Sequence, residues 1–174
     1  MSRIAYVNGR YLPHGAATVH IEDRGYQFAD GVYEVIAVRD GVLIDGDWHM
    51  ERLQRSLSEL RIAMPMSVAA LNIVLSETVR RNRFSVGIVY LQVSRGVARR
   101  DHPFPKDGTP PALVVTARRT PPTPAKIIDE GIAVISQPDI RWDRCDIKAI
   151  ALLPNVLVKQ AAREQGAYEA WQVD

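Results

Sequence analysis

Charged residues crowd around Lys148. Residues 140–150 read IRWDRCDIKAI and lie between an apolar strand-like run and an apolar helix-like run. Because lysine and arginine are almost never fully buried unless they are paired, so much charge between two core elements indicates either a surface turn or a working site. In a working site the lysine amine acts as a nucleophile. A lysine such as Lys148, taken alone, is more often a solvated surface residue. Residues elsewhere in the chain are therefore needed to choose between a surface turn and a working site.

A second group of reactive side chains lies in residues 94–105, whose prolines and glycine exclude a helix. The stretch contains Arg95, Arg99, Arg100 and His102. Guanidinium groups on a loop that is held by flanking strands present a fork of hydrogen-bond donors to a carboxylate or a phosphate. From these residues alone, a solvated basic loop is an equally good interpretation.

Arg52 and Tyr33 lie on predicted regular elements. Residues 45–60 are predicted to form a helix with a leucine stripe on its buried side, and Arg52 lies beside that stripe. Its spacing favours a solvated helix arginine. Residues 32–39 are predicted to form a strand with Tyr33 on one face and Glu34 on the other. From the strand pattern alone, Tyr33 is equally well explained as a core aromatic.

The composition excludes several classes of protein. A length of 174 residues, 47% of them hydrophobic, and a net charge of +2 are typical of an ordinary soluble globular protein. The basic residues are scattered, so no footprint for nucleic acid or an anionic membrane is present. A single cysteine, Cys145, excludes an internal disulfide, and the four histidines lack paired ligand spacing, which predicts no metal. The chain lacks a signal peptide pattern or a long apolar run, so a cytoplasmic location is expected.

Two amphipathic helices are inserted among strands in the first part of the chain. Asn8-Gly9 predicts a β-hairpin turn, residues 22–31 predict a polar loop, and Ser67 is predicted to cap a second helix that runs to about residue 82. The sequence TPPTP at residues 120–124 is the clearest linker and marks a domain boundary.

The segment after the linker is short. It is predicted to contain a strand at residues 131–136, a helix that begins at Pro154 and ends at Gly166, and a last strand at residues 167–173. About fifty residues are near the lower limit for an independent core. We therefore expect part of the second domain to be missing after Asp174.

Four stretches, in the same order, closely resemble the signature of D-amino acid aminotransferases, which are fold type IV pyridoxal phosphate enzymes. They are EDRGYQFADGVYEV at residues 22–35, HMERL at 49–53, RDH at 100–102 and RWDRCDIK at 141–148. One match alone would be weak, but four ordered matches over most of the chain are specific. The resemblance implies a two-domain α+β fold, with a small N-terminal α+β domain (residues 1–119), an interdomain linker (120–126) and the start of a larger, barrel-like cofactor-binding domain (127–174).

The resemblance also implies roles for individual residues. Lys148 resembles the lysine that forms the internal aldimine with pyridoxal 5'-phosphate, and Arg52 resembles the arginine that contacts the cofactor phosphate. Glu169 matches a position near the cofactor, although an outward strand residue explains it comparably well. The substrate carboxylate is gripped in this family by residues that match Arg100 and His102, with Tyr33 beside them. Because that pair reaches the pocket from the partner subunit, a homodimer is expected.

The function implied is transfer of the amino group of a D-amino acid such as D-alanine to a 2-keto acid such as 2-oxoglutarate. Alternatives within the fold type are a branched-chain L-amino acid transaminase, an (R)-amine transaminase and aminodeoxychorismate lyase. The Arg100-x-His102 pair, typical of the D-specific branch, argues against them. A noncatalytic dimerisation module is a further alternative, but such a module has no need of Lys148.

Overall fold

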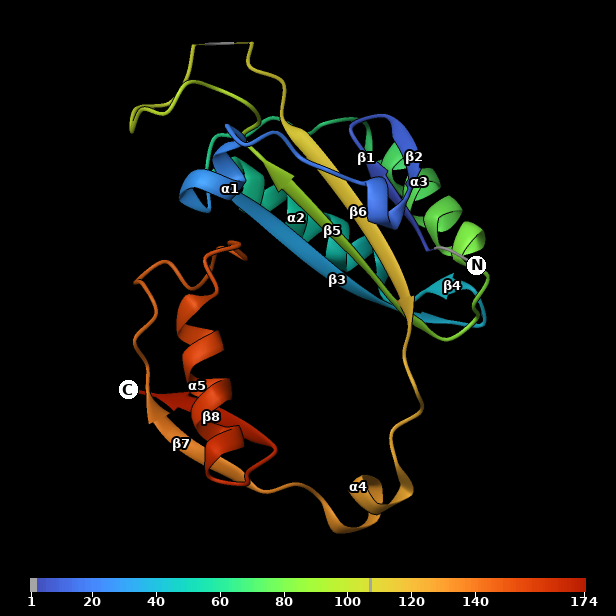
Figure 1. The fold of residues 1–174 in the computed structure, drawn as a ribbon, viewed down its shortest axis with the longest axis vertical. Coiled ribbons are helices and arrows are strands. Elements are labelled where there is room, and N and C mark those ends of the chain that lie inside the picture. Colours follow the sequence, from blue (N-terminus) through green and yellow to red (C-terminus); the bar gives the residue numbers. More distant parts are fainter. Residues whose placement is uncertain (1–2, 107) are drawn as a thin grey trace. The chain divides into compact units, whose positions relative to one another are not determined.

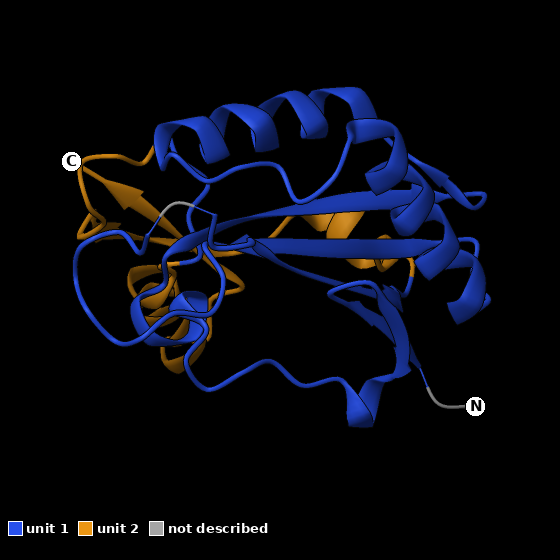
Figure 2. Cartoon of the chain, turned by 90° about the horizontal axis from the view of Figure 1, so that it is seen from above, with its two compact units in different colours: residues 1–121, 146–150 blue, residues 122–145, 151–174 orange. Residues whose placement is uncertain are grey.

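The structure is a computed structural model that describes residues 3–106 and 108–174, and it divides the chain into two units (Figure 2). Unit 1 comprises Met1–Pro121 together with Asp146–Ile150. Unit 2 comprises Pro122–Cys145 and Ala151–Asp174. The five residues around Lys148 thus belong to the first unit, although the chain reaches them only after it has entered the second.

Unit 1 contains a six-stranded sheet in the order β2-β1-β6-β5-β3-β4, with every neighbouring pair antiparallel (Figure 1). Its strands are β1 (Ile4–Val7), β2 (Arg10–Pro13), β3 (Gly31–Arg39), β4 (Val42–Leu43), β5 (Gly87–Ser94) and β6 (Ala112–Arg119). The predicted hairpin turn is confirmed, because Asn8 and Gly9 have φ angles of 44° and 93°.

One face of this sheet is covered by two helices. Helix α2 (Gly46–Glu59) packs on β3, and α3 (Val68–Asn82) packs on β1, β5 and β6. Leu53 and Leu57 of α2 and Leu71 and Leu75 of α3 are fully buried in the core that results. The predicted cap of α3 is also confirmed, because the Ser67 side chain accepts a hydrogen bond from the backbone N–H of Ala70.

The segment of residues 22–31, predicted as a loop, contains a short helix. Helix α1 (Arg24–Phe28) begins after Asp23, whose side chain accepts a hydrogen bond from Gly25 N, and ends at Ala29 in the left-handed conformation. The loop prediction is wrong for these five residues. An aspartate cap and tertiary contacts of Arg24 stabilise a helix whose own sequence is too short to show helical periodicity.

Unit 2 contains a parallel pair of strands and two helices. Its elements are α4 (Ala125–Glu130), β7 (Val134–Pro138), α5 (Leu153–Glu164) and β8 (Glu169–Val173). Strands β7 and β8 pair in parallel, and α5 contacts both of them, since parallel neighbours need a crossover connection. Among the described residues, no helix combines the length and the apolar composition that crossing a membrane requires.

Gly31 at the start of β3 lies against both β5 and the segment that carries Lys148. A Cβ at this position would lie 2.6 Å from the carbonyl oxygen of Val93 and 3.2 Å from Cδ1 of Ile150. We expect Gly31→Ala to lower the free energy of unfolding by about 1–3 kcal/mol, because the backbone of β5 cannot move away cheaply. Urea unfolding measures this change.

Gly15→Ala is the matched control for that variant. No atom lies within 4 Å of a Cβ built at Gly15. Its unfolding free energy should stay within about 0.5 kcal/mol of the wild-type value. Equal stability of the two variants would contradict the close approach of β3 and β5 at Gly31.

Candidate active site

The backbone around Lys148 is fixed to the edge of β3. The carbonyl oxygen of Lys148 accepts a hydrogen bond from Tyr33 N at 3.1 Å, and Ile150 N donates to Gly31 O at 3.1 Å. On the helix side, Lys148 N donates to Ser56 Oγ of α2 at 3.3 Å. The neighbouring Ile147 is only 4% exposed, because its side chain enters the core of unit 1. The residues around Lys148 therefore extend the sheet beside β3.

The side chain of Lys148 lies against an aromatic pair. Its Nζ is 4.2 Å from the ring centroid of Tyr33, and that ring stacks on Tyr90 with 5.7 Å between centroids. Tyr33 and Tyr90 are diagonal neighbours on β3 and β5, since Tyr33 is opposite Gln92 in the register. Within residues 3–106 and 108–174, no carboxylate lies within ion-pairing distance of Lys148 Nζ. The side-chain nitrogen of Lys148 is thus placed by its contact with the Tyr33 ring and by the backbone hydrogen bonds of the residue.

Tyr90 stabilises this arrangement as a neutral phenol. Burial, with a further electrostatic contribution from the neighbouring Tyr33 side chain, raises the pKa of Tyr90 to about 12. The Tyr90 hydroxyl donates a hydrogen bond to Oε1 of Gln92 at 2.7 Å. Tyr90 therefore stays protonated at neutral pH and supports Tyr33 without supplying charge.

Arg52 lies on the other side of β3, where it is bound by a buried acid. Glu34 is fully buried, and its two carboxylate oxygens accept hydrogen bonds from Nε and Nη2 of Arg52 at 2.7 and 2.6 Å. His49 Nδ1 lies 2.7 Å from the same carboxylate. The hydrogen bonds that Arg52 donates to Glu34 raise the pKa of Arg52. About half of the Arg52 side chain remains exposed, so the guanidinium is held rigidly while part of it faces solvent.

Helix α2 connects these two groups. Arg52 and Ser56 are four residues apart and therefore lie on one face of the helix. Ser56 binds the backbone of Lys148, and Arg52 binds Glu34, the residue that follows Tyr33 on β3. The proposed phosphate-binding arginine and the lysine are thus positioned by the same helix and the same strand.

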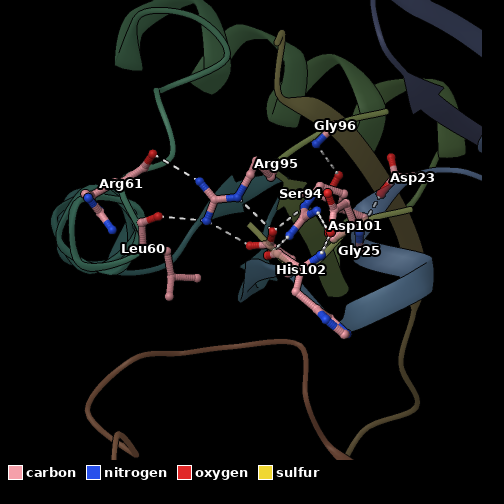
Figure 3. Close-up of polar contacts among 11 residues, drawn as sticks. Asp23, Gly25, Leu60, Arg61, Ser94, Arg95, Gly96, Asp101 and His102 are labelled. Carbon is pink, nitrogen blue, oxygen red and sulfur yellow. Dashed lines mark hydrogen bonds and ion pairs between the residues drawn. The ribbon is translucent and has the colours of Figure 1, made fainter. Parts of the chain in front are cut away.

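Arg100 and His102 lie on the exposed connection between β5 and β6, and Figure 3 shows the polar contacts beneath it. The guanidinium of Arg100 is 4.8 Å from the ring centroid of Phe28, and the ring of His102 is 5.8 Å from it. The structure therefore brings Arg100 and His102 together on one aromatic ring. Within the described part of the chain, the Tyr33 ring stacks on Tyr90 and lies under Lys148, and it makes no ring contact with this pair.

A buried ion cluster holds the base of this connection. Asp30 accepts hydrogen bonds from Nε of Arg24 and from Nε and Nη2 of Arg95, at 2.7, 2.7 and 2.9 Å. Arg24 and Arg95 are 4% and 7% exposed. Burial alone would raise the pKa of Asp30, but the hydrogen bonds from Arg95 and Arg24 and their charges outweigh it and hold the pKa below its ordinary value. Asp30 is therefore ionised in the folded protein at neutral pH.

Glu169 lies in unit 2, at the start of β8. Its carboxylate pairs with Lys159 of α5 at 2.9 Å and also accepts a hydrogen bond from Ala170 N. The hydrogen bond from Lys159, then that from Ala170 N, lowers the pKa of Glu169. A role near the cofactor stays a prediction for this residue.

The sequence did not predict the residues that hold the candidate site in place, which are Glu34, Arg24 and Asp30. Glu34 occupies a core-facing position of β3, whose other core-facing residues are apolar, and this mismatch was the available signal. Arg24 and Asp30 gave no such signal, because they lie in a polar segment where charged residues are ordinary. Their burial depends on contacts with residues more than sixty positions away in the sequence.

Comparison with known proteins gives consistent matches. A model of the amino-transferase class IV family matches residues 31–174. A D-alanine aminotransferase from Bacillus licheniformis is 45% identical over 94% of this chain, which spans 57% of that relative's length. The structure of an Escherichia coli branched-chain amino acid aminotransferase superposes with a TM-score of 0.87 at 20% identity, covering 100% of this chain and 60% of that one.

A second solved structure carries a cofactor. A hypothetical aminotransferase from Mycobacterium tuberculosis, in a PLP-bound form, superposes with a TM-score of 0.76 at 22% identity. The superposition covers 98% of this chain and 61% of that one. At these identities the two structures show the fold alone, and they confirm the predicted α+β class with its antiparallel sheet.

Because of the ion cluster at Asp30, the free energy of unfolding should depend on pH in the acid range. Because the pKa of Asp30 is lower in the folded protein, its stabilisation is complete above the ordinary aspartate value and is lost as the pH falls through the lower folded value. We expect Asp30→Asn to lower the unfolding free energy at neutral pH by about 3 kcal/mol, because two buried guanidinium groups lose their carboxylate. Below about pH 4 the wild type should lose stability faster than the variant.

Urea unfolding at several pH values between 7 and about 3 tests this convergence. Asp129→Asn, at an exposed position of α4, is the matched control and should follow the wild type throughout. A gap between Asp30→Asn and the wild type that stays constant at every pH would contradict the role of the Asp30 charge.

Proposed function

This chain belongs to the amino-transferase class IV family, and from that premise we propose that the protein is a pyridoxal phosphate-dependent transaminase of D-amino acids. The proposed reaction moves the amino group of a D-amino acid such as D-alanine to a 2-keto acid such as 2-oxoglutarate. The 45% identity to a D-alanine aminotransferase supports the choice of substrate. The Arg100-x-His102 pair on one aromatic ring supports it as well.

The observation that carries the proposal is the placement of Lys148. Its backbone is fixed by Tyr33 and Ser56, while its amine lies on the half-exposed face of the sheet against the Tyr33 ring. A surface lysine has no need of so many backbone restraints. An amine that must approach a carbonyl carbon at a defined angle benefits from them, because positioning lowers the barrier of a bimolecular step.

The side chains present fit the cofactor. Arg52 offers a half-exposed guanidinium, held by Glu34, whose planar fork suits a phosphate. Lys148 offers an amine that no carboxylate of the described residues engages. When bound, pyridoxal phosphate supplies the electron sink that stabilises negative charge at the substrate Cα. Glu169 is proposed to lie near the cofactor.

The chain's own residues then handle the substrate and its proton. Arg100 and His102 bind the α-carboxylate, and Tyr33 lies beside the reacting group. With the cofactor bound, Lys148 Nζ would take the proton from the substrate Cα as a base and, as an ammonium group, would then donate it as an acid to the cofactor side of the bound molecule. We propose that Arg100 and His102 serve the site of a partner subunit, so that the working enzyme is a homodimer.

Lys148→Ala should abolish covalent retention of the cofactor and turnover. Treatment with pyridoxal phosphate and borohydride should add one phosphopyridoxyl group, the mass of the cofactor less one oxygen atom, to the wild type, and peptide mapping should place it on Lys148. Lys126→Ala, at an exposed lysine of α4, should keep both the adduct and the activity. An adduct that persists in Lys148→Ala would show that the lysine is assigned wrongly.

The choice of substrate is tested by a half-reaction without keto acid. D-Alanine should convert the absorbance of the bound cofactor to that of the pyridoxamine form, because the proposed carboxylate pair fixes which face of Cα meets Lys148. L-Leucine should leave the spectrum nearly unchanged. Conversion by L-leucine and not by D-alanine would instead favour a branched-chain L-amino acid transaminase.

A further inference from the structure

The connection that carries Arg100 and His102 needs an anchor, because its described residues form no helix or strand of their own. It leaves β5 at Ser94 and reaches β6 only at Ala112. A segment that became ordered only on binding would lose conformational entropy each time it met a substrate. Contacts with the core can order it in advance.

Arg24 of helix α1 provides the direct link between the core and this pair. Its Nη1 donates to the carbonyl oxygen of Asp101 at 2.6 Å, and its Nη2 donates to that of His102 at 3.4 Å. Its Nε donates to Asp30 at 2.7 Å. Arg24 is 4% exposed, so the donor side of these hydrogen bonds is withdrawn from solvent, while Asp101 and His102 are themselves exposed.

The buried cluster contains two guanidinium groups but one carboxylate, which explains why Arg24 also binds the carbonyl oxygens of Asp101 and His102. One carboxylate, Asp30, serves two buried guanidinium groups, and the donors it cannot satisfy must find other acceptors. Arg95 donates to the carbonyl oxygens of Leu60 and Arg61 at 2.8 and 3.2 Å (Figure 3). Arg24 donates to the carbonyl oxygens of Asp101 and His102, the two residues that follow Arg100. The buried cluster thus selects one backbone path for the connection.

Phe28, four residues after Arg24 in the same helix, adds a second restraint. The guanidinium carbons of Arg24 and Arg100 each lie 4.8 Å from its ring centroid. Arg24 is buried and pairs with Asp30, whereas no carboxylate of residues 3–106 and 108–174 pairs with Arg100. Arg100 is exposed, so its guanidinium, held against an aromatic ring, is accessible to a substrate carboxylate.

We propose that Arg24 is a positioning residue for the carboxylate site, acting through the carbonyls of Asp101 and His102 and through Phe28. This inference rests on the proposed function, since it assumes that Arg100 and His102 bind the substrate carboxylate. Arg24 itself does not touch the substrate. Its effect is on how well ordered the pair is before the amino acid arrives.

Arg24→Lys tests the proposal in the enzyme loaded with pyridoxal phosphate. Lysine keeps the charge near Asp30, but its single ammonium cannot reproduce the planar fork that joins Asp30 to two carbonyls. We expect KM for D-alanine to rise by about 10-fold while kcat changes by less than about 2-fold, because the carboxylate is bound in the ground state and the transition state alike. Cofactor absorbance should stay unchanged.

Arg81→Lys is the matched control. Arg81 also pairs with a carboxylate, that of Glu77 at 2.7 Å, and also lies over an aromatic ring, that of Tyr11 at 4.0 Å. It belongs to α3, away from the connection. Its KM and kcat should equal those of the wild type, so a general cost of replacing arginine by lysine is separated from a role of Arg24.

Phe28→Leu is a second variant that keeps the hydrogen bonds of Arg24. It should raise KM in the same direction by a smaller factor, which keeps the proposal testable if Arg24→Lys folds poorly. A double-mutant cycle shows whether Arg24 acts through Arg100. In an Arg100→Ala background, Arg24→Lys should raise KM by a clearly smaller factor than it does in the wild type, because one of the two groups that it positions is gone.

Two results would overturn the proposal while the proposed function stands. One is an unchanged KM in both Arg24→Lys and Phe28→Leu, and the other is an equal rise in KM with and without Arg100. A parallel loss of kcat, cofactor absorbance and unfolding free energy would show a merely structural role and would overturn it as well. If the wild type fails to convert D-alanine, the proposed function fails and this inference fails with it.

Discussion

The ion pairs that Asp30 makes with Arg24 and Arg95 are the constraint on which the rest of the site depends. Two buried guanidinium groups share one carboxylate, so backbone carbonyls of two separate segments must satisfy the remaining donors. The cluster thereby ties the start of β3, the end of helix α2 and the connection after β5 to one point. Arg100 and His102, which lie on a segment without regular structure, are thereby anchored to the core.

Two adjacent residues of strand β3 contact different candidate site residues on its two faces. The helix-covered face carries Glu34, which is fully buried and holds Arg52, while the other face carries Tyr33 with the amine of Lys148 above it. Successive side chains of a strand point to opposite faces, so two adjacent residues can hold the Arg52 guanidinium and contact the Lys148 side chain at once. Helix α2 completes the link through Ser56.

Much of the fold was predictable because it depends on local chemistry. The Asn8-Gly9 turn, the Ser67 cap and the leucine stripe of α2 each follow from the preferences of a few neighbouring residues, and the structure confirms them. Helix α1 was not predictable in this way. Its Arg24 is stabilised by residues 77 and 78 positions further along the chain, and no local pattern contains that information.

The sequence by itself determined the residue types of the proposed transaminase site, their order along the chain and the family to which the chain belongs. It could not show which of them are supported, because Lys148, Arg52 and Arg100 each look like a solvated cation when read alone. Only the tertiary structure decided that Lys148 docks on β3, that Arg52 is held by a buried Glu34, and that Arg100 shares the Phe28 ring with Arg24. The physical reason is that desolvation and pairing are properties of three-dimensional neighbours, and these neighbours are distant in the sequence.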